Sequence, residues 1–108
     1  MFTRHVTLKL KANSAAEFNR IIEHEALPLL RKQKGFRDEI TFVAPERLEA
    51  VGNSFWDTKE DAQAYNSTGY PEVLKALSKV VEGTPTVELF EVSSSTFHKL
   101  ASAAKVGS

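Results

Sequence analysis

Glu25 and Arg4 are the residues whose types and positions best suit acid–base chemistry. At 100° per residue along a predicted helix, Glu25 lies about 20° from Phe18 and about 40° from Leu29, in the middle of the apolar face. Burial disfavours the ionised form of such a carboxylate, so Glu25 is a candidate general base for a phenolic or α-carbonyl proton. Arg4, on an apolar parity of a predicted strand, is its expected partner, in catalysis or in a purely structural ion pair. A helix that turns Glu25 toward solvent is the alternative.

The candidate substrate-binding residues gather around the only tryptophan. Trp56 ends a predicted strand next to a helix start, and a large aromatic side chain there closes either the core or the mouth of a pocket. Both alternatives stay open at this point. The polar side chains expected to line such a pocket are Asn53 on the same strand and Tyr65, Asn66 and Tyr70 on the helical segments that follow.

A proline near the end of the first predicted helix is expected to disturb its regular geometry. Pro28 has no N–H for the carbonyl of His24, and its ring crowds the preceding turn, so a kink is predicted. The kink would open space beside the helix. His24 then either lies at a pocket edge, as an acid–base partner of Glu25 and a substrate contact, or is exposed to solvent.

The first elements that must position these residues are a strand and a helix. Apolar and polar side chains alternate over residues 2–10, which predicts a strand. A capping box from Ser14 to Glu17 would begin a helix over residues 15–32, and Gly35 would stop it.

The remaining elements are predicted from turn and capping residues. Strands over residues 36–43 and 48–56 are joined by a short Pro-containing link and are expected to pair antiparallel. Asp57 or Thr58 would cap a helix that is interrupted at residues 67–71 and ends at Gly83. A last strand is then predicted over residues 86–92.

This β-α-β-β-α-β order predicts an α+β, ferredoxin-like fold in which one four-stranded antiparallel sheet carries both helical segments on one face. The second and third strands have apolar residues at both odd and even positions, so apolar side chains are expected on both faces of the sheet. The face away from the helices must then be covered by another part of the structure. A second copy, packed sheet to sheet in a C2 homodimer, is the expected cover.

Residues 1–92 form the predicted domain. Residues 93–108, with apolar side chains at helical spacing (Phe97, Leu100, Ala101 and Ala104), form an extension expected to pack on its own domain or on the partner subunit.

Composition restricts the classes of function. The 108 residues support one domain, and 42% hydrophobic with 26% charged residues is typical of a globular protein. A formal net charge of +0 gives no field that favours nucleic acid or an anionic membrane, so a small aromatic or otherwise apolar ligand is expected instead. The apolar runs are too short to span a bilayer, and the N-terminus lacks a signal-peptide layout, which predicts a cytoplasmic location.

No cofactor and no metal are predicted. The chain has no cysteine, which excludes disulfides, thiol nucleophiles and zinc–thiolate sites. Its three histidines, His5, His24 and His98, lack metal-ligand spacing. No glycine-rich loop follows a strand and opens a helix, so the phosphate cradle of nucleotide cofactors is missing as well.

The order of elements, residues 29–36 (LLRKQKGF) and residues 56–62 (WDTKEDA) together resemble the antibiotic biosynthesis monooxygenase family over roughly residues 1–92. The resemblance implies a dimeric α+β barrel. The family includes cofactor-free quinone-forming monooxygenases, quinol monooxygenases, haem-degrading enzymes and many proteins with no assigned activity. A tryptophan at the position of Trp56 is widespread among them, and some members use it in or beside their pocket.

The departures from the family argue against haem degradation. Haem-degrading members have an asparagine on the first strand and a histidine in the second helical region. This chain has Arg4, His5 and Val6 on the strand and no histidine between Asp57 and Gly83.

The resemblance and the candidate residues together predict a small cofactor-independent monooxygenase acting on a quinol or polyphenol. Glu25 would deprotonate the substrate, and Trp56, Tyr65 and Tyr70 would hold its ring. The first alternative is a dimeric small-molecule-binding or stress-related module that uses the same pocket without turnover. The second alternative is a pocket closed by side chains, which would leave only dimerisation.

Overall fold

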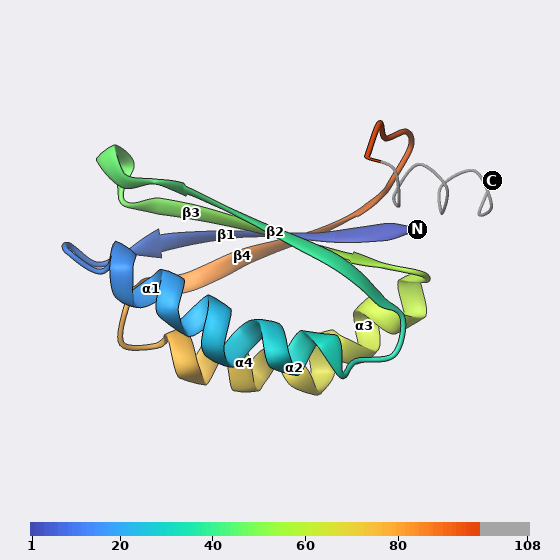
Figure 1. The fold of residues 1–108 in the computed structure, drawn as a ribbon, viewed down its shortest axis with the longest axis horizontal. Coiled ribbons are helices and arrows are strands. Elements are labelled where there is room, and N and C mark those ends of the chain that lie inside the picture. Colours follow the sequence, from blue (N-terminus) through green and yellow to red (C-terminus); the bar gives the residue numbers. More distant parts are fainter. Residues whose placement is uncertain (98–108) are drawn as a thin grey trace.

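The computed structural model describes residues 1–97 and shows one antiparallel sheet with its helices on a single face (Figure 1). The strand order in the sheet is β2-β3-β1-β4, so both β1 and β3 are central. The strands are β1 (Phe2–Leu10), β2 (Phe36–Ala44), β3 (Glu49–Trp56) and β4 (Val81–Glu91). The helices are α1 (Ala15–Ile21), the π-helical turn η1 (Ile22–Ala26), α2 (Leu27–Arg31), α3 (Lys59–Ser67) and α4 (Gly69–Leu77), and a 3₁₀ turn, η2 (Pro45–Arg47), joins β2 to β3. The predicted α+β, ferredoxin-like fold is confirmed.

Local sequence signals explain where several elements begin and end. Thr58 caps α3, because its hydroxyl accepts a hydrogen bond from the Asp61 N–H at 3.0 Å. Gly35 has φ +79° after the end of α2, and its carbonyl accepts the Asp57 N–H at 2.9 Å. A Cβ at Gly35 would stand 2.1 Å from the Asp61 carboxylate, so only glycine fits at this turn.

The predicted capping box at the first helix is wrong. Ser14 has φ −106° and ψ 0°, and its hydroxyl donates to the Ala12 carbonyl at 3.4 Å instead of capping the helix. A capping side chain normally requires extended backbone at the cap residue, which Ser14 does not have. Glu17 pairs with Arg20 instead.

The last strand begins five residues earlier than predicted, at Val81. The apolar pair Val80 and Val81 continues the spacing of α4 in the sequence, but α4 ends at Leu77. Gly83, with φ +68°, and Pro85 lie inside β4, where the register against β1 shifts between Thr7 and Lys9. A bulge in an edge strand accommodates both residues, because the strand needs no ladder hydrogen bond there.

The irregularity predicted at Pro28 takes the form of a π-turn. The Leu27 N–H donates to the Ile22 carbonyl, five residues back, and Pro28 stands in the first turn of α2, where its missing N–H costs least. The wider turn holds one residue more than an α-helical turn. Ala26 therefore faces the sheet where a regular helix would place Glu25.

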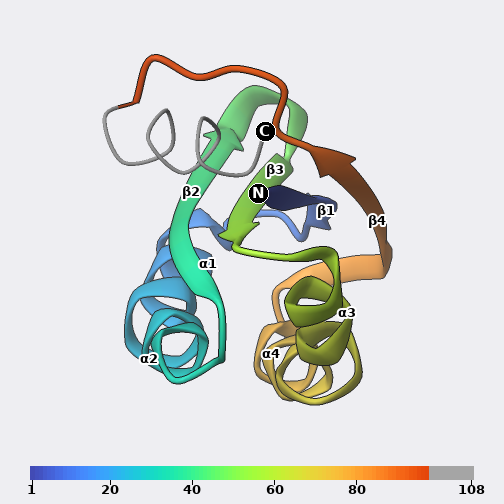
Figure 2. The ribbon, with the colours of Figure 1, turned by 90° about the vertical axis from the view of Figure 1, so that its right-hand side faces the viewer.

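The core lies between the sheet and the helices, and its most completely buried large side chains are Trp56, Phe18, Leu10 and Ile21. Figure 2 shows α1 and α2 as one column and α3 and α4 as another, both beneath the same face of the sheet. No helix within residues 1–97 packs on the opposite face, which is the helix-free face of the described structure, and on it Phe42 is 56% exposed and Phe90 49% exposed.

Residues 92–97 follow β4 on the side of the sheet away from the described helices (Figure 2), and the Val92 N–H donates to the Met1 carbonyl at 2.9 Å. The helical spacing predicted for the C-terminal extension falls almost wholly on residues 98–108, outside the described residues. Within residues 1–97, no helix has the length and apolar character needed to cross a bilayer.

Candidate functional site

A cavity of about 60 Å³ lies between the inner face of the sheet and the two helical columns. Its walls are mostly apolar, with Ile22, Ala26, Leu27 and Leu30 from η1 and α2, Val73 and Leu77 from α4, and Val6 and Leu8 from β1. Five polar side chains complete the lining: Arg4, Glu39, Ser54, Tyr65 and Tyr70. An apolar cavity with a few convergent polar groups is the usual form of a small-molecule site.

The strand register brings three of these polar residues into one row across the sheet. Arg4 on β1 pairs with Ser54 on β3, and Ser54 pairs with Glu39 on β2. Directly paired residues point to the same face, so all three side chains face the helices. In the next row Gly52 stands between its neighbours without a side chain, which leaves space at the floor of the cavity.

Arg4 is only 3% exposed, yet within residues 1–97 it forms no ion pair. Its guanidinium donates to Asn66 Oδ1 at 2.7 Å. It also lies 4.2 Å from the ring centre of Tyr70 and 5.0 Å from that of Tyr65, which are cation–π distances. Burial lowers the pKa of Arg4 and the two tyrosines oppose that shift, but an arginine stays charged at neutral pH.

Glu39 is the carboxylate that the fold places in this cavity. Burial raises its pKa above the usual glutamate range, and the hydrogen bond from Thr41 Oγ1 to Glu39 Oε2, at 2.6 Å, opposes that shift. A carboxylate of this kind is a stronger proton acceptor than a solvated one.

The two cavity tyrosines are neutral hydrogen-bond donors. Burial raises the pKa of Tyr65 to about 12, partly opposed by the charge of Arg4. Burial likewise raises the pKa of Tyr70. The Tyr70 hydroxyl is buried beside the Arg4 guanidinium, and no described residue accepts its proton, so that proton is available to a ligand.

Trp56 lies behind the cavity wall and belongs to the core. It is 0% exposed and stacks on Tyr65 with 5.0 Å between ring centres. Its Nε1 donates to Ser54 Oγ at 2.9 Å, so the hydroxyl proton of Ser54 is free to point elsewhere. Of the two alternatives left open by the sequence, the structure supports the core, and Trp56 supports the site through Ser54 and Tyr65.

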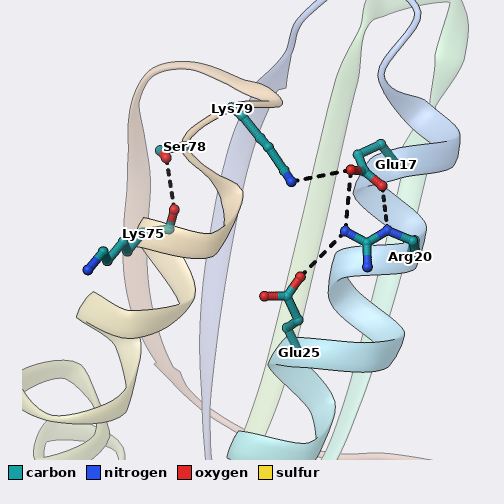
Figure 3. Close-up of polar contacts among 6 residues, drawn as sticks. All are labelled: Glu17, Arg20, Glu25, Lys75, Ser78 and Lys79. Atoms are coloured by element: carbon teal, nitrogen blue, oxygen red, sulfur yellow. Dashed lines mark hydrogen bonds and ion pairs between the residues drawn. The ribbon is translucent and has the colours of Figure 1, made fainter.

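The predicted burial of Glu25 and its pairing with Arg4 are wrong. The Glu25 side chain is 47% exposed and lies 3.6 Å from Arg20. Figure 3 shows it in a surface ion cluster with Arg20, Glu17 and Lys79, in which Lys79 Nζ lies 3.4 Å from Glu17 Oε2. The π-turn is the cause, because it rotates Glu25 off the apolar face.

Two predicted substrate contacts also lie away from the cavity. His24 is exposed on η1, which is the solvent alternative. Asn53 occupies the helix-free face of the sheet, where its side-chain oxygen lies 2.9 Å from His5 Nδ1. Of the predicted site residues, the structure therefore brings together Arg4, Tyr65 and Tyr70.

The residues that sequence reasoning missed are Glu39, Ser54 and Gly52. The signal was the hairpin register. Once the link after β2 sets Ala44 opposite Glu49, Glu39 falls opposite Ser54, in line with Arg4. In the described part of the chain, no group of three or more His, Cys, Asp or Glu side chains is arranged to hold a metal ion.

The sequence matches no protein-family model and no curated relative. Its structure, however, is similar to several solved ones. SnoaB, a cofactor-independent oxygenase from Streptomyces nogalater, has a TM-score of 0.72 at 16% identity, over 90% of this chain and 97% of that chain. A monooxygenase from the gene ActVA-Orf6 of Streptomyces coelicolor, solved in complex with nanaomycin D, has a TM-score of 0.74 at 14% identity, over 89% and 90%. The protein of unknown function NE2512 from Nitrosomonas europaea has a TM-score of 0.74 at 16% identity, over 89% and 92%. A putative antibiotic biosynthesis monooxygenase from Bordetella bronchiseptica has a TM-score of 0.73 at 15% identity, over 84% of this chain and 95% of that chain. At these identities the comparisons establish the fold alone, and the predicted resemblance in fold to the antibiotic biosynthesis monooxygenases is confirmed.

Proposed function

We propose that this chain is a cofactor-independent monooxygenase that oxidises a small quinol or polyphenol in the cavity between sheet and helices. The observation that carries the proposal is the row of Arg4, Ser54 and Glu39 on the floor of an otherwise apolar cavity. The fold shared with a monooxygenase and with a cofactor-independent oxygenase supports it.

The row supplies a proton acceptor and an anion-stabilising group at opposite ends. Glu39 accepts the phenolic proton, the role that the sequence suggested for Glu25. Arg4 and the Tyr70 hydroxyl stabilise the negative charge that then develops on the substrate, and the mostly apolar lining makes such interactions stronger than they are in water.

The deprotonated ring is electron-rich and reduces oxygen itself. One oxygen atom forms the new bond to carbon and the other leaves as water, so a hydroquinone and one molecule of oxygen give a hydroxyquinone and one water. All electrons come from the substrate. The protein's part is to bind the ring, hold the proton on Glu39 and keep solvent away from the anion.

The proposal includes the homodimer. The helix-free face of the sheet carries Phe42 and Phe90, which are about half exposed, and a second copy related by a two-fold axis would cover both at once. Light scattering at micromolar concentration is expected to give twice the mass of one chain, and a monomer would contradict the dimer.

Oxygen consumption tests the activity. With a panel of hydroquinones and no added metal, flavin or haem, the wild-type chain is expected to consume oxygen in proportion to the quinone formed. Glu39→Gln is expected to lower the rate by about 10²-fold or more, the usual effect of a positioned general base.

The matched control is Glu25→Gln, which changes the same chemical group on the exposed surface and is expected to leave the rate unchanged. Equal losses in the two variants would contradict the role of Glu39. Binding of quinols without any oxygen uptake by the wild type would instead support a small-molecule-binding module without turnover.

A further inference from the structure

Arg4 in the cavity wall forms no ion pair with any described residue, and from this we infer that the substrate is a single-ring phenolic acid whose carboxylate binds Arg4. The inference rests on the proposed function, because it specifies the substrate of the same site. It adds a permanent anionic group to the substrate, and it limits the size of the ring system.

The surroundings of Arg4 leave room for an anion. Arg4 donates a hydrogen bond to a neutral amide, Asn66, and its guanidinium carbon lies over the rings of two neutral tyrosines, Tyr65 and Tyr70. Aromatic rings occupy the faces of a guanidinium, whereas a carboxylate binds its edge through parallel N–H donors. The guanidinium N–H groups that do not donate to Asn66 are therefore the donors that a ligand carboxylate would use.

A buried charge without a counter-charge is unfavourable for the folded state. Arg4 is 3% exposed and has no acidic partner within residues 1–97. The hydrogen bond to Asn66 and the contacts with the two tyrosine rings do not neutralise this charge, whereas an anionic ligand would supply a counter-charge and gain affinity from it.

Glu39 is not the missing counter-charge. It lies two strands away from Arg4 with Ser54 between them, which separates the backbones by about 10 Å. Its Oε2 accepts from Thr41 instead. A ligand lying across Ser54 would place its carboxylate at Arg4 and a ring hydroxyl toward Glu39, so the two ends of the row recognise different groups.

The size of the cavity limits the ring system. Its volume is about 60 Å³. Sites for drug-sized ligands measure roughly 300–1,000 Å³, and an apolar cavity of about 150 Å³ admits benzene. Even one ring must therefore widen the space between the helical columns, and each further ring would require a larger displacement, which favours a single-ring substrate.

A pair of probes that differ only in charge tests the inference. The binding of 2,5-dihydroxybenzoate and of its methyl ester is measured by calorimetry in the absence of oxygen. The acid is expected to bind about tenfold or more tightly than the ester. Arg4→Met, which keeps the length and removes the charge, is expected to abolish that preference, and Glu25→Gln is expected to retain it.

Three results would overturn the inference: equal affinity for acid and ester, a preference that survives Arg4→Met, or no binding of the acid at millimolar concentration. A fourth readout concerns folding. Ligand-free Arg4→Met is expected to melt at the same temperature as the wild type or higher, because the uncompensated charge is gone. A melting temperature well below that of the wild type would make Arg4 a structural residue.

These results are separable from the activity. If the acid preference holds but no phenol is oxidised, the monooxygenase proposal fails and the anion site stands. If hydroquinone is oxidised but the acid has no advantage over the ester, the anion site fails and the monooxygenase proposal stands.

Discussion

Two neighbouring rows on the inner face of the sheet use the same strands for opposite purposes. The aromatic row pairs Trp56 with Phe36, and Tyr65 stacks on the indole, so the space is filled. The polar row, two residues further along the strands, consists of Arg4, Ser54 and Glu39 and borders the cavity. Buried aromatic contacts stabilise the fold, whereas buried unpaired charges do not. We therefore expect the aromatic row to determine the stability of the fold and the polar row to determine the chemistry of the cavity.

The largest effect is expected in the aromatic row. Trp56→Ala is expected to lower the free energy of unfolding by about 3–5 kcal/mol, because it removes the largest fully buried side chain. Chemical denaturation measures the change, with Trp56→Phe as the control that keeps most of the ring. A loss below about 1 kcal/mol would mean that the aromatic row does not stabilise the core.

The hydrogen bond between the two rows is expected to have a smaller effect. Ser54→Ala leaves the buried Trp56 Nε1–H without its acceptor, so the free energy of unfolding is expected to fall by about 1–3 kcal/mol. Ser54→Thr keeps the hydroxyl and is the matched control. Equal stability of the Ala variant and the wild type would show that the two rows are energetically independent.

The polar row is expected to give the reaction its pH dependence. Glu39 must be deprotonated to accept a proton, so the rate is expected to fall as pH drops through its raised pKa, by about tenfold per unit. Thr41→Val removes the hydrogen bond that lowers this pKa and is expected to move the limb to higher pH. If the pH at which the rate falls does not change in that variant, the pH dependence belongs to a group other than Glu39.

The same shift has a defined effect on stability. Because the folded-state pKa of Glu39 is raised, its contribution favours the folded state below its unfolded pKa and is lost as pH rises through the folded value. Glu39→Gln is therefore expected to flatten the dependence of the unfolding free energy on pH in that window.

The smallest effect is expected at the surface ion cluster (Figure 3). Lys79→Met removes the ion pair with Glu17, but both side chains are largely exposed, so the melting temperature is expected to be unchanged within measurement error. A clear decrease would show that the contact between α1 and the end of α4 holds the helical columns together.

The elements that the sequence predicted best are those with local signals. Alternation over residues 2–10 matches β1, and Thr58 caps α3 as one of two expected residues. The misplaced start of β4 has a physical reason, since Val80 and Val81 fit a helical spacing equally well and only pairing with β1 decides between them.

The candidate site was harder to predict because it depends on relations between elements. Arg4 was expected from its strand parity and as the partner of Glu25, and of these only the position facing the helices is correct. The position of Glu39 depends on the register of β2 against β3, which the sequence does not state directly. The position of Glu25 departs from the prediction because a π-turn does not advance 100° per residue.

The π-turn also determines which insertions and deletions the first helical segment can tolerate. The buried residues before and after it, Phe18, Ile21, Ala26 and Leu30, would fall at the regular spacing of a continuous α-helix if a single codon between positions 23 and 25 were lost. Pro28 would then stand inside an unbroken helix, where it costs about 3 kcal/mol. The extra residue and the proline are thus coupled. A relative that lacks the extra residue of the π-turn is expected to lack the proline as well. An alignment of such a relative with this chain must place its gap inside the helix.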